Sequence, residues 1–239
     1  MTLFLTSSPC IIGAERAILS DANGLVQRLQ AVLPEGPQVL FVCANPVDYE
    51  RTDEFAEAFT QAFLEAGIEF SDFATLDHRN MEEAEELVAM AELIILSGGH
   101  VPTQNEFFQE IGLRELMEGY EGVVMGISAG TMNCADEVYA QPEEPGESAP
   151  EFERFLPGLG LTDINILPHY QQVKDYTLDG KRLFEDVTYD DSWGHVFYAF
   201  PDGTYLYEDE DERAIYGQFY RISDGILELL QDDGDRFEL

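Results

Sequence analysis

Basic residues are scarce in this sequence. Twelve lysines and arginines stand against 48 aspartates and glutamates in 239 residues, and the formal net charge at pH 7 is −36. A chain with this charge repels nucleic acid and the surface of an anionic membrane, so we expect neither as a partner. The acids are typical of a solvated surface, because many of them occupy the polar face of helix-like segments such as 81–92.

Cysteines are also few. Cys10, Cys43 and Cys134 form no CxxC pair, so we expect neither a disulfide framework nor a zinc knuckle. Each lies in or beside an apolar run, where a reduced thiol behaves as a small hydrophobic side chain. This use of cysteine predicts a cytoplasmic protein.

Long hydrophobic runs are absent as well. No stretch approaches the roughly 20 apolar residues that a transmembrane helix requires. The apolar run 3–8 near the start of the chain has no basic region before it. We therefore interpret it as a first buried strand and not as part of a signal peptide.

The sequence does contain short apolar runs that alternate with amphipathic segments. The runs lie at 3–8, 39–45, 93–99, 123–130 and 164–169. Amphipathic segments at 53–66 and 80–91 lie between them and indicate helices. This alternation is typical of βαβ units and a mostly parallel sheet.

The final third of the chain has a different pattern. Aromatic-rich runs at 196–200, 204–209, 214–222 and 226–230 are separated by turn sequences such as PDG and SDG. They indicate antiparallel strands that extend or flank the main sheet. We predict one α/β domain over residues 1–239, flavodoxin-like, with a mostly parallel sheet, helices on both faces and antiparallel strands in the C-terminal third.

The strongest local signal for chemistry is GISAG at 126–130. It follows the apolar run VVM and precedes the helix-compatible segment 131–138. A G-x-S-x-G sequence between strand and helix is the nucleophile elbow, in which a tight turn holds the serine oxygen above the sheet. Glycines on both sides are needed because a Cβ there would collide with the neighbouring strand or helix. The motif makes Ser128 the candidate nucleophile.

A second glycine-rich turn, SGGH at 97–100, follows the run LIIL. Paired glycines at a strand end let backbone amides approach a ligand closely, so Gly98 is a candidate binding residue. We expect the Gly99 N–H and the Ala129 N–H to form an oxyanion hole.

A general base is also needed. His169 lies just past the end of the apolar run 164–168, and sites in open α/β sheets lie at the carboxyl ends of strands. It is therefore the best placed of the four histidines, which are His78, His100, His169 and His195.

A carboxylate is needed to orient the imidazole. Asp202 follows the run 196–200 and is our first choice, although Pro-Asp-Gly is also a good turn sequence. Glu143, in the proline- and acid-rich segment 141–153, is the alternative. We interpret that segment as a surface loop.

The segments LIILSGGH, VVMGISAGTMNCAD and NILPHY, in that order, resemble peptidase family S51, the family of bacterial dipeptidase E. The resemblance covers roughly residues 38–205. It implies a class I glutamine-amidotransferase-like fold with serine in place of cysteine, and a cytoplasmic, cofactor-free serine peptidase that removes an N-terminal aspartate from dipeptides. The family's serine and histidine fall on Ser128 and His169, its acid on Asp202, and a second acid of some members near Glu143.

The resemblance is incomplete in the segment after the histidine. Members with aspartyl specificity carry an arginine there that holds the substrate carboxylate, and this sequence has no clean match. The basic residues of the segment are Lys174, Lys181 and Arg182. We expect the last two, with Gly98 and His100, to contact the substrate.

Two other functions share these motifs. An esterase of the α/β-hydrolase type would use Ser128 with His195 and either Asp163 or Asp175. A non-catalytic relative would bind a small molecule in the same pocket. No two histidines have the spacing of metal ligands, so we expect no metal. The expected partner is a short peptide substrate, bound by a monomer or a homodimer.

Overall fold

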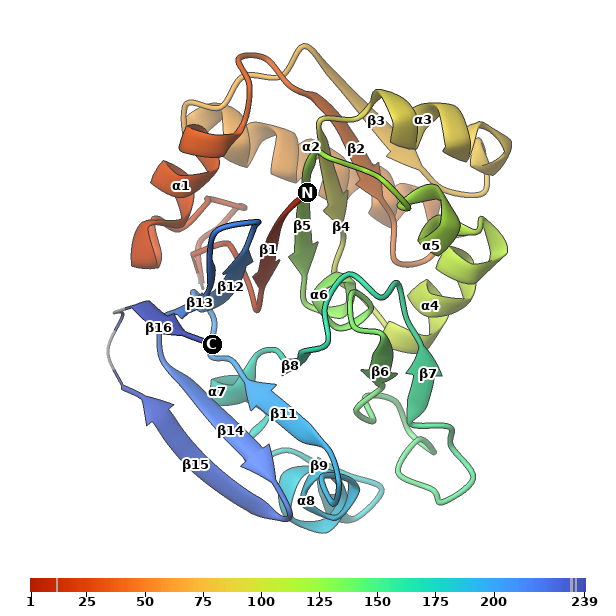
Figure 1. The fold of residues 1–239 in the computed structure, drawn as a ribbon. Helices are drawn as coiled ribbons and strands as arrows, with labels where there is room; N and C mark the ends of the chain where they lie inside the picture. Colours follow the sequence, from red (N-terminus) through yellow and green to blue (C-terminus); the bar gives the residue numbers. More distant parts are fainter. Residues whose placement is uncertain (12, 233, 235) are drawn as a thin grey trace.

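A computed structural model of the chain describes residues 1–11, 13–232, 234 and 236–239. Its centre is an eight-stranded sheet in the order β16-β13-β12-β1-β5-β4-β2-β3 (Figure 1). The strands of this main sheet are β1 (Thr2–Thr6), β2 (Gln38–Val42), β3 (Asp72–Leu76), β4 (Leu93–Leu96), β5 (Val123–Ile127), β12 (Tyr205–Glu208), β13 (Arg213–Tyr216) and β16 (Arg236–Glu238).

The first five of these strands are parallel, and β12, β13 and β16 add antiparallel strands at the β1 edge. The predicted mostly parallel sheet with antiparallel strands in the C-terminal third is thus confirmed. Because β1 lies directly beside β5 in parallel, with Thr6 opposite Ile127, the segment that follows β1 and the turn that follows β5 lie at the same edge of the sheet.

Helices cover both faces of the main sheet, because its central strands are apolar on both sides. Leu40 and Val42 of β2 belong to one core cluster, whereas Val39 and Phe41 belong to the other. The first cluster includes residues of α3 (Ala84–Met90), α4 (Val101–Glu110) and α5 (Leu113–Leu116). The second includes residues of α1 (Leu25–Val32) and α2 (Tyr49–Glu65). Burying a side chain of this kind contributes about 1.5–3 kcal/mol.

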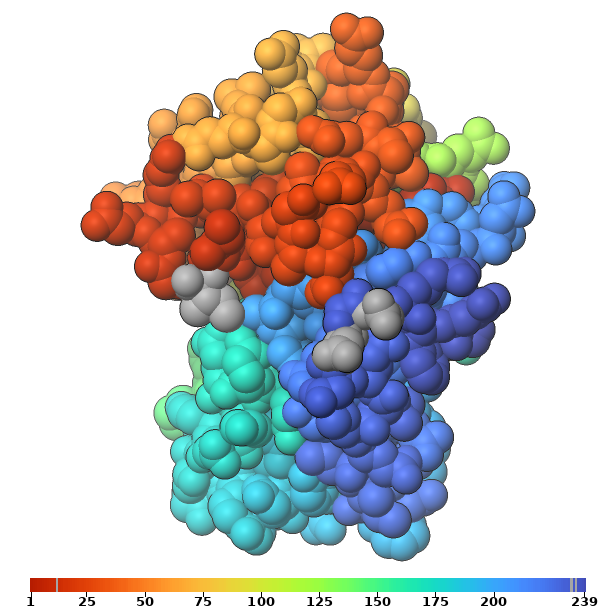
Figure 2. All heavy atoms as spheres, turned by 90° about the vertical axis from the view of Figure 1, so that its left-hand side faces the viewer, coloured from red at the N-terminus to blue at the C-terminus, as the bar shows by residue number. Residues whose placement is uncertain are grey.

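A second sheet has four strands in the order β15-β14-β11-β8. Its members are β8 (Asn165–Leu167), β11 (Val196–Ala199), β14 (Phe219–Ser223) and β15 (Ile226–Gln231). The sequence pattern predicts that the run 164–169 adds a strand to the main parallel sheet. This prediction is wrong, because the run forms β8 of the second sheet. The free side of β1 is occupied by β12, and β8 pairs in parallel with β11 instead. Figure 2 shows much of the C-terminal half of the chain, coloured teal to blue, below the red and orange N-terminal part.

The remaining elements are short. They are β6 (Glu137–Tyr139) paired with β7 (Phe155–Pro157), β9 (Thr177–Leu178) paired with β10 (Lys181–Arg182), α6 (Ala129–Met132), α7 (Tyr170–Val173), α8 (Tyr189–Asp191), the short 3-10 helices η1 (Ala22–Gly24) and η2 (Met81–Glu83) and the π-helix η3 (Phe184–Thr188). The segment 131–138 is helical only to Met132, because Glu137–Tyr139 pairs with β7 as strand β6. Within the described residues, no helix is long and apolar enough to cross a bilayer.

Candidate active site

The main cavity next to Ser128 lies where the strand order of the parallel sheet reverses. Strand β2 leads through α2 to β3 on one side, and β4 lies on the other side of β2. In open α/β sheets, ligands bind at such a point, outside the carboxyl ends of the strands. The cavity has a volume of about 660 Å³. Its wall includes Ala44 after β2, Gly98 and Gly99 after β4, and Ser128 after β5.

Ser128 occupies the turn between β5 and α6 in a strained backbone conformation. Its φ of 52° and ψ of −111° lie outside the regions that side-chain-bearing residues favour. Such strain costs on the order of 1–3 kcal/mol and persists only where the surroundings hold it. Here the Ser128 N–H donates to the Thr6 carbonyl oxygen on β1 at 3.1 Å. The turn therefore has the form that a nucleophile elbow requires.

The glycines flanking Ser128 allow this turn to pack. A Cβ on Gly126 would lie 2.8 Å from Cα of Thr131 in α6, and a Cβ on Gly130 would lie 2.2 Å from the carbonyl oxygen of Leu96 in β4. Backbone atoms cannot move aside as a flexible side chain can. Gly126 thus lets α6 approach β5, and Gly130 lets α6 approach β4.

His169 reaches Ser128 from the end of β8. Its backbone is left-handed, with φ of 57°, and its N–H donates to Oγ of Ser7 at 2.7 Å. The ring nitrogen Nε2 lies 2.9 Å from Oγ of Ser128. The other ring nitrogen, Nδ1, lies 2.7 Å from Oδ1 of Asp202. With the proton on Nδ1, Nε2 is free to accept the serine hydroxyl proton, which is the geometry of an activated nucleophile.

Asp202 is almost fully enclosed, with a side chain that is 2% exposed. Besides the His169 ring, three side chains donate to its carboxylate. Ser7 donates to Oδ1 at 2.8 Å, and Gln171 and Gln172 each donate to Oδ2 at 2.6 Å. Burial on its own would raise the pKa of Asp202, but the hydrogen bond and charge of His169, with the other donors, lower it to about 2. Asp202 is therefore a carboxylate over the whole physiological pH range.

Two backbone N–H groups near Ser128 in the described chain have no protein acceptor. Among the described residues, neither Gly99 nor Ala129 donates its N–H to a protein acceptor. A Cβ on Gly98 would lie 3.3 Å from Cβ of Ser128, so this glycine packs directly against the serine. These two unpaired donors are the ones that the sequence predicts for an oxyanion hole.

The acidic segment 141–153 is less of a surface loop than its composition suggests. Gln141, Pro142 and Ser148 are buried, and Glu143 and Glu144 line the main cavity. The segment is attached to the SGGH turn, because Oε1 of Glu147 lies 2.7 Å from Nε2 of His100. This loop therefore forms part of the site wall.

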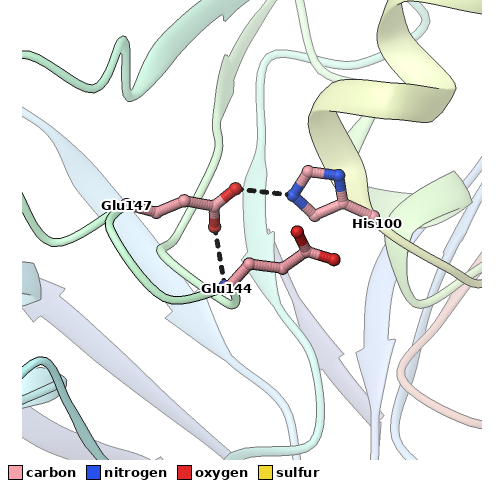
Figure 3. A group of neighbouring side chains, drawn as sticks. All are labelled: His100, Glu144 and Glu147. Carbon is pink, nitrogen blue, oxygen red and sulfur yellow. Dashed lines mark hydrogen bonds and ion pairs between the residues drawn. The ribbon is translucent and has the colours of Figure 1, made fainter.

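His100, Glu144 and Glu147 form the one group of potential metal ligands found in the described part of the chain, with donor atoms within 4.8 Å of one another (Figure 3). His100 also bonds to Oγ1 of Thr103 through Nδ1 at 2.8 Å. Oε2 of Glu147 accepts the N–H groups of residues 143 and 144. These bonds give the group a structural role, because they join the loop to the start of α4.

Glu143 faces both His100 and His169 across the cavity. Desolvation by the surrounding protein raises the pKa of its carboxyl to about 7, and the nearby Glu147 adds to this, whereas the two histidines oppose it. Among the described residues, however, no hydrogen bond joins Glu143 to His169. The structure thus pairs the imidazole with Asp202 and leaves the alternative acid at the cavity wall.

The basic residues expected to contact the substrate lie elsewhere. Nζ of Lys181 donates to the Ser148 carbonyl oxygen at 2.7 Å, and Arg182 pairs with Asp186. Neither residue, nor Lys174, lines a cavity next to Ser128. Their hairpin, β9 and β10, is held against the acidic loop, a position that the sequence could not indicate.

A second, smaller cavity adjoins the first at Ser128, Glu143 and His169. Its volume is about 220 Å³. Apolar side chains contribute much of its wall, among them Met132, Pro142, Pro168, Val173, Tyr176 and Leu183. An apolar substrate side chain fits this lining.

His195 is not part of this arrangement. Its Nδ1 lies 3.6 Å from a carboxylate oxygen of Glu137, and its ring stacks on Phe155 with centroids 4.4 Å apart. Asp163 pairs with Arg213. Within the described residues, no hydrogen bond or ion pair joins His195 to Ser128, Asp163 or Asp175, so the combination that an α/β-hydrolase esterase would need is not assembled there.

Three residues that contact Asp202 were not found from the sequence. Ser7 directly follows β1, so the rule that sites lie at carboxyl strand ends could have found it. Gln171 and Gln172 lie two and three residues after the predicted base, and their side chains donate to the acid. No sequence signal distinguishes them from exposed helix residues.

Comparisons with known proteins identify the family and the fold. The profile of peptidase family S51 matches residues 3–215. A peptidase from an acI-B1 Actinobacterium has a similar structure, with a TM-score of 0.64 and 20% identity over 100% of this chain and 96% of that one. A putative peptidase E protein from Listeria monocytogenes EGD-e is also similar, with a TM-score of 0.60 and 19% identity over 96% of this chain and 98% of that one. No curated protein matches the sequence.

Proposed function

The chain belongs to peptidase family S51, and from that premise we propose that it is a serine-type dipeptidase with a Ser128–His169–Asp202 triad. The family makes it a peptidase, a hydrolase of peptide bonds. The proposal of a serine triad rests on one observation. Hydrogen bonds run from Ser128 to His169 at 2.9 Å and from His169 to Asp202 at 2.7 Å.

In the proposed mechanism, Oγ of Ser128 attacks the peptide carbonyl carbon while Nε2 of His169 takes its proton. The N–H groups of Gly99 and Ala129 stabilise the resulting oxyanion, and each such donor is worth roughly two to three orders of magnitude in rate. His169 then gives its proton to the leaving amine. Water, deprotonated by the same imidazole, hydrolyses the acyl-enzyme and restores Ser128.

Asp202 supports each proton transfer without changing its own charge. Its carboxylate holds the proton of His169 on Nδ1 and stabilises the imidazolium that forms. The low pKa of Asp202 keeps it ionised throughout the cycle.

A short substrate suits the size and lining of the two cavities. A volume of about 660 Å³ lies within the range of small-molecule sites. The smaller cavity suits an apolar side chain on the other side of the scissile bond. The family resemblance adds a preference for N-terminal aspartate to the proposal.

The proposal is tested by assaying hydrolysis of X-Leu dipeptides with Asp, Glu, Lys or Ala at X. We expect cleavage by the wild-type protein, fastest with Asp, and loss of cleavage in Ser128→Ala. Ser71→Ala is the matched control, because Ser71 is exposed and precedes β3 at the amino edge of the sheet. Hydrolysis that persists unchanged in Ser128→Ala would remove the mechanism.

A further inference from the structure

Helix α2 presents a row of side chains to the main cavity. Arg51, Phe55 and Phe59 all line it and are spaced four residues apart, which places them on one face of the helix. Asp48 caps the helix by accepting the Arg51 N–H at 3.4 Å. The start of this helix is therefore fixed at the cavity.

Arg51 differs from every other arginine of the chain in its pairing. In the part of the chain that the structure describes, the other arginines each have a carboxylate within 4 Å, and Arg51 has none. In a chain with 48 acids and 12 basic residues, acidic partners are abundant. A guanidinium left without one, at the wall of the site cavity, is available to a ligand.

The guanidinium is also held in position. Its central carbon lies 5.2 Å from the centroid of the Phe55 ring, within the range of a cation–π contact. Stacking on a ring face leaves the N–H groups at the edge of the guanidinium free. These donors match a carboxylate, which they can bind through two parallel hydrogen bonds.

We propose that Arg51 binds a carboxylate of the peptide substrate, an inference that rests on the proposed dipeptidase function. The carboxylate belongs either to the C-terminus of the dipeptide or to the side chain of an acidic N-terminal residue. Glu143 and Glu144 line the same cavity, so the cavity offers both charges to a ligand that carries an ammonium and a carboxylate. Arg51 thereby offsets the repulsion that a chain of net charge −36 exerts on an anionic group.

The test compares wild type, Arg51→Ala and Arg51→Lys on four substrates: Asp-Leu, Ala-Leu and the C-terminal amide of each. Removing a hydrogen-bonded charge pair should raise KM by about 10- to 100-fold with a smaller effect on kcat. Arg51→Lys keeps the charge but not the paired donors, so it should recover part of the loss. Arg221→Ala, which removes an arginine paired with Glu228 outside the cavity, should leave all values unchanged.

The four substrates identify the carboxylate. If Arg51 binds the C-terminus, Arg51→Ala should impair Ala-Leu but not Ala-Leu amide. If it binds the acidic side chain, Asp-Leu amide should be impaired and Ala-Leu should not. Equal effects on all four substrates, or no effect on any, would overturn the inference.

If the proposed dipeptidase function is wrong, the wild-type protein will cleave none of the four substrates, which is a different result. Calorimetric binding of Asp-Leu to the Ser128→Ala variant, with and without Arg51→Ala, then tests the inference alone. Affinity that does not change on loss of Arg51 would refute it.

Discussion

The pairing of Asp202 with His169 leads to a quantitative prediction for Asp202→Asn. The carboxylate accepts from four donors, two on each oxygen. An asparagine amide has one oxygen and one NH₂ group, so it must present donors either to His169 and Ser7 or to the two glutamines. In the first arrangement, Nδ1 becomes an acceptor, the proton moves to Nε2, and His169 cannot accept the Ser128 proton.

Two magnitudes follow from this change. We expect kcat for dipeptide hydrolysis to fall by about four orders of magnitude, as expected for loss of the correct tautomer. The pKa of Asp202 is lowered from 3.8 to about 2, which corresponds to about 2 kcal/mol of folding stability. Because the folded-state pKa is depressed, this stability is present above pH 3.8 and is lost as the pH falls through about 2.

Both effects can be measured on the same preparations. Steady-state kinetics gives kcat, and urea unfolding between pH 6 and pH 2 gives the stability difference between wild type and Asp202→Asn. That difference should narrow by about 2 kcal/mol as the pH falls. Glu143→Gln is the matched control for the acid. A variant Asp202→Asn with near wild-type kcat, beside an inactive Glu143→Gln, would refute the assignment.

Three further changes have defined outcomes. Gly130→Ala should destabilise the fold by about 3 kcal/mol or more in urea unfolding, because its Cβ meets the Leu96 carbonyl oxygen at 2.2 Å; an unchanged midpoint would contradict the packing. Ser7→Ala removes a donor to Asp202 and should lower kcat roughly tenfold with an unchanged circular dichroism spectrum; an unaltered kcat would show that Ser7 does not position the acid. The pKa of Glu143 is raised from 4.5 to about 7, so the wild-type protein loses folding stability as the pH rises through that range and this carboxyl ionises. Glu143→Gln should therefore gain stability relative to wild type between pH 5 and pH 8. A stability difference between the two proteins that does not change with pH would argue against the raised pKa.

Much of the fold could be predicted because its signals are local. The strand cores at 39–45, 93–99 and 123–130 are apolar on both faces, and only a parallel sheet covered by helices buries such runs. Strand β3 gave a weaker signal, since Asp72–Leu76 lies at the sheet edge and is only partly buried. The partner of β8 depends on contacts between residues 32 positions apart, such as Asn165 with Phe197, and the length of an apolar run carries no information on its partner.

The residues of the candidate site were likewise predictable only where their sequence signal is local. Ser128 and the glycines around it could be identified because their turn needs those residue types at that spacing. Arg51 could not, because it lies on a helix whose acidic pattern is typical of a solvated face. Lys181 and Arg182 were expected at the substrate because they follow His169 in sequence, but the chain reverses at β9 and β10 and directs them to the acidic loop.

The most direct test of the account is the rate at which a fluorophosphonate labels the protein, followed by mass spectrometry of its peptides. We predict a single adduct on Ser128, formed at least about 100-fold more slowly in His169→Ala and at the wild-type rate in His195→Ala. Labelling at a different residue, or equally fast labelling of Ser128 without His169, would contradict it.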